Sequence, residues 1–84
     1  MSKLSDEYIF QTLKETNKKI ADLKEFNVPI ILQTIEEYKK SGVDQVFIDQ
    51  QQVQLQKIYA MIEEMEAKKL RLLNRLHNTT HLGG

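Results

Sequence analysis

This 84-residue sequence contains no cysteine, only one proline and only three glycines. Without cysteine the chain can form no disulfide and offers no thiolate for catalysis. A chain this short buries only about 60 to 65% of the surface that it exposes when unfolded. Small domains that cannot use disulfides are commonly stabilised by a metal ion or by a second subunit. We therefore expect metal binding or self-association to contribute to its stability.

The sequence also lacks an excess of charge of either sign and lacks a long hydrophobic run. Twelve lysines and arginines balance twelve aspartates and glutamates, which argues against nucleic acid as a partner because binding to its backbone relies on a positive field. No stretch approaches the roughly 18 apolar residues that indicate a membrane span. The start, MSKLSDEYIF, has acidic residues and no apolar core of a secretory signal. We expect a cytoplasmic protein that does not bind membranes.

A helix with one buried face is predicted for residues 5–26. Ser5 is the expected N-cap, and the two acidic residues that follow it suit the positive end of a helix dipole. When each residue is turned by about 100°, the apolar residues of this stretch fall within one narrow stripe. The stripe contains Ile9, Leu13, Ile20 and Leu23, with Thr16 among them.

The single proline, Pro29, is expected to break or kink the first arm. Proline lacks an N–H group and clashes with the preceding turn, which costs about 3 kcal/mol inside a helix and almost nothing in its first turn. It also biases the residue before it, Val28, away from helical angles. We therefore predict a break or kink at Asn27 and Val28 and a new helix over residues 29–41, ended by a left-handed Gly42. The predicted buried face of this helix consists of Ile31, Leu32, Ile35 and Tyr38.

The stretch FIDQQQVQLQK, residues 47–57, alternates glutamine with apolar residues and is compatible with a strand or a helix. Strands would need turn signals on both sides, which are missing, whereas the residues that follow are strong helix formers. We predict one helix over residues 44–78, roughly 50 Å long, capped by Asp44, and a flexible tail over residues 79–84. Alternating steps of three and four residues, interrupted only by Lys69, give this helix a heptad pattern, which comprises Leu55, Ile58, Ile62, Met65, Leu72 and Leu76.

Together these segments predict an all-α single domain over residues 1–84, an antiparallel helical hairpin with three helical segments and a first arm broken or kinked near Pro29. The long helix carries apolar residues over close to half its circumference, whereas a partner helix covers little more than about 100°. Part of this surface should stay uncovered in a monomer, so we predict that the hairpin self-associates into a helical bundle. The predicted interface residues are Phe10, Leu55, Ile58, Ile62, Met65, Leu73 and Leu76.

Polar and charged residues of the long helix bear on how copies assemble. Gln51, Gln54 and Lys69 fall inside its apolar stripe, where a polar residue commonly fixes register or subunit number, although the glutamines could instead contact a ligand. Residues 43–66 carry five acidic residues and one lysine, and residues 67–84 carry four basic residues and no acidic one. Two such helices attract each other when antiparallel, unless the basic residues serve only to complement the helix dipole.

No motif of an enzyme or of a cofactor site is present. The sequence contains no glycine-rich phosphate loop and no cysteine nucleophile. Its serine, histidine and aspartate residues do not occur in the order and sequence context of a catalytic triad. His77 and His81 are four residues apart, a spacing that lets two imidazoles share a metal ion. No third ligand is apparent nearby, and we predict neither a metal site nor a cofactor.

One group of residues has the character of a ligand site, namely Tyr8 and Lys24 in the first arm with Arg71 and Arg75 in the long helix. In an antiparallel hairpin the end of the second arm lies beside the start of the first, so Tyr8 and the arginines can be neighbours. An aromatic ring with cationic side chains suits a nucleotide-like anion, through stacking on the base and charge-assisted hydrogen bonds to phosphate. The alternative is that these basic residues only pair with acidic residues at helical spacing.

The predicted function is that of a small non-enzymatic oligomeric interaction protein, an adaptor or inhibitor that binds a partner protein through a helix face. The alternative is a protein that sequesters an anionic nucleotide-like signal between its subunits. In size and expected architecture the chain is similar to the small helical-hairpin sponges with which phages take up cyclic nucleotide signals, a likeness that no motif carries. Binding of nucleic acid through the basic end of the long helix is the third possibility, which zero net charge disfavours.

Overall fold

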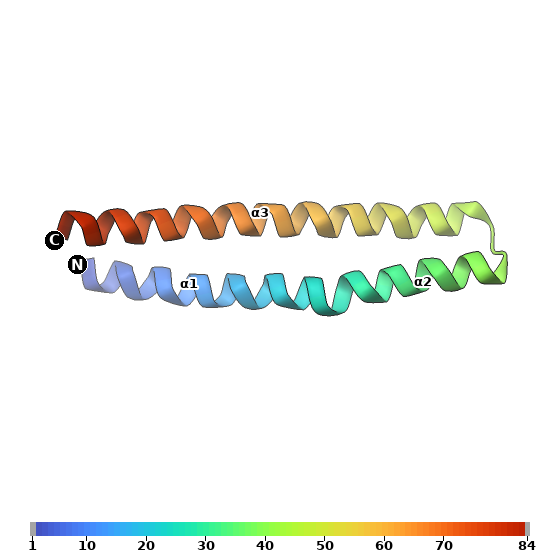
Figure 1. The fold of residues 1–84 in the computed structure, drawn as a ribbon, viewed down its shortest axis with the longest axis horizontal. Coiled ribbons are helices and arrows are strands. Elements are labelled where there is room, and N and C mark those ends of the chain that lie inside the picture. The colour runs from blue at the N-terminus through green and yellow to red at the C-terminus, as the bar shows by residue number, and fades with distance from the viewer. Residues whose placement is uncertain (1, 84) are drawn as a thin grey trace.

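The computed structural model describes the backbone of residues 2–83 and the side chains of residues 6–77. The chain forms an antiparallel hairpin of two helical arms (Figure 1). The first arm consists of α1 (Ser2–Asp22), the π-helical segment η1 (Leu23–Asn27) and α2 (Val28–Ser41), and the second arm is α3 (Gln45–Gly83). The prediction of an all-α hairpin whose first arm is kinked near Pro29 is confirmed.

A left-handed glycine closes the first arm, as predicted. Gly42 has φ 71° and ψ 29°, and its N–H group donates a hydrogen bond of 3.1 Å to the carbonyl oxygen of Tyr38. The N–H group of Val43 donates to the same oxygen at 3.3 Å. Tyr38 and Val43 both pack against the buried residues near the turn, which is the apolar contact that usually accompanies this type of helix end.

The segment η1 widens the first arm just before Pro29. The N–H group of Val28 donates to the carbonyl oxygen of Leu23, five residues earlier. Val28 keeps helical angles of φ −62° and ψ −50°, so the predicted departure of this residue from helical angles is wrong. The wider turn gives the proline ring room beside the preceding carbonyl groups, and Pro29 therefore bends the arm without ending the helix.

The helices extend further at the chain ends than predicted. α1 begins at Ser2, so Ser5 lies inside it and is not its N-cap. α3 begins directly after Asp44, whose carbonyl oxygen accepts the N–H group of Phe47 at 3.1 Å. It then continues to Gly83 through residues for which the sequence predicts a tail, whereas Gly84 lies outside the described residues. Neither proline nor glycine interrupts this stretch before Gly83, and its asparagine, threonine and histidine residues are each only about 0.5 kcal/mol less favourable in a helix than alanine.

Side chains packed between the two arms form a seam along the hairpin. On the first arm the alternation of three and four residues contains a single step of five, from Leu23 to Val28, because η1 holds one extra residue. The extra residue is taken up by the π turn, so both halves of the arm face α3. The α3 side of the seam consists of Ile48, Gln51, Leu55, Ile58, Ile62, Met65, Lys69, Leu72 and Leu76, and the first arm contributes Ile9, Leu13, Thr16, Ile20, Leu23, Val28, Ile31, Ile35 and Tyr38.

Two residues assigned to the buried stripes point elsewhere. Leu32 is 47% exposed, because it lies about 100° round the helix from Ile31 while Val28 takes the inward position. Gln54 is also exposed, whereas Gln51 and Lys69 are half-buried at the seam as predicted. Of the three polar residues in the α3 stripe, two therefore lie where they can influence register.

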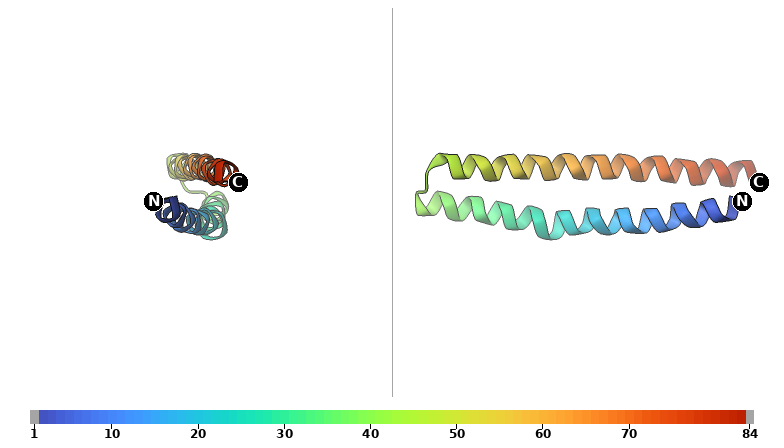
Figure 2. Two further views of the ribbon diagram at one scale, coloured as in Figure 1. Left: turned by 90° about the vertical axis from the view of Figure 1, so that its left-hand side faces the viewer. Right: turned by 180° about the vertical axis from the view of Figure 1, so that it is seen from behind.

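The hairpin is a narrow rod. It measures 62 × 15 × 15 Å, and its radius of gyration is 18.6 Å, compared with about 12 Å for a globular domain of the same length. Figure 2 shows the two arms side by side, end-on and from behind, with the described chain ends at the end of the rod opposite the turn. Each arm has only the other to pack against, so one side of each helix faces the partner arm and the rest faces solvent.

Candidate interaction surface

The rod shape leaves a large surface exposed. The accessible surface is 6695 Å², about 1,500 Å² more than the roughly 5,200 Å² typical of a compact monomer of this mass. Large hydrophobic side chains of α3 are among the exposed residues, so the prediction that α3 keeps uncovered apolar surface is confirmed for the described residues. The large hydrophobic side chains that are exposed by two fifths or more are Tyr8, Phe10, Phe26, Ile30, Leu32, Val46, Phe47, Val53, Tyr59, Met61, Leu70 and Leu73.

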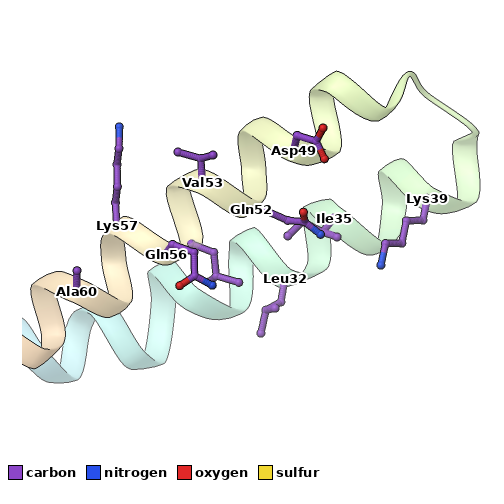
Figure 3. A pocket seen from close by; sticks show the side chains of 10 residues that line it. Leu32, Ile35, Lys39, Asp49, Gln52, Val53, Gln56, Lys57 and Ala60 are labelled. Atoms are coloured by element: carbon purple, nitrogen blue, oxygen red, sulfur yellow. The ribbon is translucent and has the colours of Figure 1, made fainter.

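A shallow groove runs along one side of the hairpin between the two arms (Figure 3). It consists of two hollows that share Gln56 and Ala60. The larger has a volume of about 830 Å³, which is within the range of small-molecule pockets, but it is open to solvent and does not enclose a ligand. We call this side the groove face. Its floor is formed by Ile35, Leu55 and Ile62, and its rims carry Lys24, Leu32 and Lys39 on the first arm and Asp49, Gln52, Gln56, Tyr59, Glu63 and Glu66 on α3.

One ion pair joins the two arms across the groove. Lys24 Nζ lies 2.7 Å from Glu66 Oε1. Seven residues toward the turn from Glu66 is Tyr59, and the equivalent step on the first arm takes eight residues, because of the extra residue in η1, and reaches Leu32. Lys24, Leu32 and Lys39 therefore follow one another on the groove side of the first arm, as Glu66, Tyr59 and Gln52 do on α3, at steps of about 10 Å. The hollow further from the turn is lined by Lys24, Tyr59 and Glu66, and the hollow nearer the turn by Leu32, Lys39 and Gln52.

The same ion pair shifts a pKa. The hydrogen bond from Lys24 and the positive charge of its ammonium group lower the pKa of Glu66 from its ordinary value of 4.5, and Lys69 contributes in the same direction. The side chains of Lys24 and Glu66 remain 54% and 47% exposed. Water screens a pair of this kind, so it contributes little to the stability of the hairpin.

The two rims of the groove carry opposite charges. Both charged residues of the first-arm rim are lysines, Lys24 and Lys39. The rim formed by α3 carries three acidic residues, Asp49, Glu63 and Glu66. Lys57 also borders the groove, but in Figure 3 its side chain extends away from the first arm. The groove face thus has an apolar floor, a basic rim and an acidic rim.

A second apolar area lies on the opposite side of the hairpin. Residues two positions apart on a helix point about 200° away from each other. Ile30 is therefore directed away from the groove face that carries Leu32, and Met61 away from the face that carries Tyr59. We call this side the opposite face. It comprises Tyr8, Phe26, Ile30, Phe47 and Met61, each of which is at least 43% exposed.

The predicted ligand residues lie at different levels of the rod. Lys24 is joined to Glu66 near the middle, and Tyr8 lies sixteen residues from it, about 24 Å toward the chain ends. Arg75 lies near the level of Tyr8, and Arg71 borders a shallow hollow on α3. One small anion could not contact Tyr8 and Lys24 of the same chain.

The residues predicted to form an oligomer interface divide between the seam and the surface. The hairpin itself buries Leu55 and Ile62 and partly buries Ile58, Met65 and Leu76. The other two, Phe10 and Leu73, are 61% and 41% exposed. Both lie on the same side of their helices as Lys24 and Glu66, from which they are separated by multiples of seven residues, so they extend the groove face toward the chain ends.

No cluster of three or more histidine, aspartate or glutamate side chains able to hold a metal ion occurs among the side chains of residues 6–77. His77 is within this part, whereas the side chain of His81 is outside it. No helix among the described residues combines the length and the apolar character needed to span a membrane.

Sequence reasoning did not identify the groove face. The missing information was the pairing of Lys24 with Glu66, which depends on the register of the two arms. One signal in the sequence could have indicated this face. Lys24, Leu32 and Lys39 follow a seven-residue repeat that contains one extra residue before Pro29.

Comparison with models of protein families, with curated proteins and with solved structures finds no match for this chain. Its function must therefore be inferred from the two faces of the hairpin.

Proposed function

We propose that this protein is a small non-enzymatic interaction protein that self-associates and acts as an adaptor or inhibitor by binding another protein. The observation that carries this proposal is the presence of two apolar faces that point in opposite directions. Pairing of two hairpins through one face leaves the other uncovered. Exposed apolar patches of this extent are typical of protein-binding surfaces.

The area available on each face suits such binding. A face 62 Å long and 15 Å wide offers roughly 900 Å², and a stable interface of standard size takes about 800 Å² from each partner. The groove is open rather than enclosing, which favours a helix over a small molecule as its occupant.

Native mass spectrometry of the protein, purified from cells without denaturation, tests this function. We expect a discrete oligomer of the 9.9 kDa chain, with a second protein bound in a fixed ratio when its partner is present. Substitution Ile30→Gln on the opposite face should remove the second protein and leave the oligomer intact. A folded monomer at tens of micromolar, confirmed by sedimentation, would contradict the proposal.

The same experiment addresses sequestration of a nucleotide-like signal. An oligomer that carries an extra mass of a few hundred daltons per site, lost on Tyr8→Ala or Arg71→Ala without a change in oligomer size, would support the sequestering function in place of the adaptor function. Tyr8 and Lys24 could then contribute to one site only from different subunits, because about 24 Å separates them within one chain.

A further inference from the structure

The groove face is complementary to itself. Its basic rim lies on the first arm and its acidic rim on α3, with an apolar floor between them. When one hairpin is turned by 180° about an axis parallel to its length and placed face to face on another, each first arm lies on the α3 of the other copy. This rotation brings every basic rim against an acidic rim.

We propose that two copies of this chain pair through their groove faces about a two-fold axis parallel to the rod, with both turns at the same end. The proposal rests on the self-association included in the proposed function and specifies its face and direction. The product is a four-helix bundle in which each α3 packs against both first arms.

Positions along the rod match in this arrangement because the rotation leaves them unchanged. Leu32 and Tyr59, which line neighbouring hollows of the groove, bring four apolar side chains of the two copies to the interface. Further from the turn, Lys24 of each copy approaches Glu66 of the other. Both side chains of this ion pair are about half exposed in the single hairpin, so each can accept a second partner.

The antiparallel arrangement, with turns at opposite ends, is disfavoured on this face. It places α3 on α3 and therefore brings acidic rim against acidic rim. Lys68 lies two residues from Glu66 and so points about 200° away from it, and Arg71 and Lys68 border a hollow that does not belong to the groove. Lys69 already acts on Glu66 of its own chain, and Lys57 is, among the described side chains, the single lysine of α3 that lines the groove. The three acidic residues of the rim therefore outnumber its one lysine, and two such rims repel each other.

The area is sufficient for a stable dimer. The roughly 900 Å² of one face matches the approximately 800 Å² per partner of a standard interface. Each copy would bury about 800 Å², roughly half of the excess surface of the hairpin over a compact monomer. A two-fold axis closes the assembly, so no groove face remains to recruit a third copy.

Distances between the two turns test the direction of pairing. The chain has no cysteine, so Ser41→Cys introduces a single exposed site for a spin label beside the turn. Pulsed electron paramagnetic resonance should give a label-to-label distance within about 30 Å, because packed helices lie 8–10 Å apart. The antiparallel arrangement would separate the labels by nearly the 62 Å length of the rod. As a control, a label on Glu64→Cys, near the middle of α3, should give a short distance in either arrangement.

A matched pair of substitutions tests which face is used. Leu32→Gln on the groove face should raise the dimer dissociation constant by at least about tenfold, since each dimer loses two leucines from its interface. Ile30→Gln, on the opposite face and more exposed, should leave the constant unchanged. Circular dichroism would show whether both variants keep their helices.

The outcomes separate this inference from the proposed function. Short distances between turns, together with the selective effect of Leu32→Gln, support it. A dimer with turns about 60 Å apart, or one weakened by Ile30→Gln alone, overturns the arrangement but leaves self-association intact. A monomer at tens of micromolar overturns both.

Discussion

Gly42 shows how one residue positions two arms. Its φ of 71° lies in the left-handed region, which a residue with a side chain enters at a cost of roughly 1 kcal/mol. A Cβ atom at this position would meet no other atom within 4 Å. Substitution to alanine should therefore lower the free energy of unfolding by about 1 kcal/mol through backbone strain alone.

Urea denaturation at one fixed protein concentration measures this effect. The neighbouring substitution Ser41→Ala, at an exposed helical position, should change stability by less than about 0.5 kcal/mol. A loss of several kcal/mol for Gly42→Ala would show that the turn contributes more than its backbone angle.

Glu66 gives a prediction about pH. Because its pKa is lower in the folded hairpin than its ordinary 4.5, its ion pair contributes stability at pH values above the unfolded pKa, and this contribution is lost as the pH falls through the folded pKa. Titration of the Glu66 side chain by nuclear magnetic resonance should give a midpoint below 4.5. Lys24→Gln should raise this midpoint.

Lys57→Gln serves as the control for this titration. It removes an equal charge nine residues away, about 13 Å along α3 and beyond the screening distance at physiological salt. An unchanged midpoint in Lys24→Gln would mean that Lys24 does not form the ion pair with Glu66 in solution.

At the level of elements, η1 reconciles a proline with a continuous helix. The π turn has two causes. One extra residue separates Leu23 from Val28 in the seam, and Pro29 cannot fit a regular turn. Deletion of Glu25 removes the extra residue and forces a regular turn, so with Pro29 present it should destabilise the hairpin by about 3 kcal/mol. Combining the deletion with Pro29→Ala should recover most of this loss.

Pro29→Ala alone separates the two causes. We expect it to keep the hydrogen bond from Val28 to Leu23, because the spacing of the seam still requires an extra residue. A crystal structure of this variant with a regular α-helix from Asp22 to Ser41 would show that the proline is the sole cause of the π turn.

The sequence predicted the elements better than their faces. The turn at Gly42 and the heptad pattern of α3 are local signals, and both were confirmed. The helical angles of Val28 were missed because the bias that proline imposes on its neighbour was given more weight than the seam packing that offsets it. Leu32 was misplaced because the sequence does not show where the extra residue is accommodated, and this decides which residues of α2 point inward.

At the scale of the whole molecule, thermal stability should depend on protein concentration. Any assembly that forms only from folded chains stabilises the folded state by mass action. The melting temperature of the unmodified protein should therefore fall on tenfold dilution across the micromolar range. For Leu32→Gln, which weakens the proposed pairing, the melting temperature should vary much less with concentration. A concentration-independent melting temperature in the unmodified protein would argue against self-association.

The elongated outline of the hairpin affects how its subunits can be counted. Its radius of gyration of 18.6 Å equals that of a globular protein of about 270 residues, three times the length of this chain. Friction with solvent rises with elongation at constant mass, so a single hairpin would leave a gel-filtration column early, at the volume of a compact oligomer. Elution volume would then report an assembly where none exists. Light scattering, which weighs the particle regardless of its outline, is the appropriate measure of subunit number for this rod.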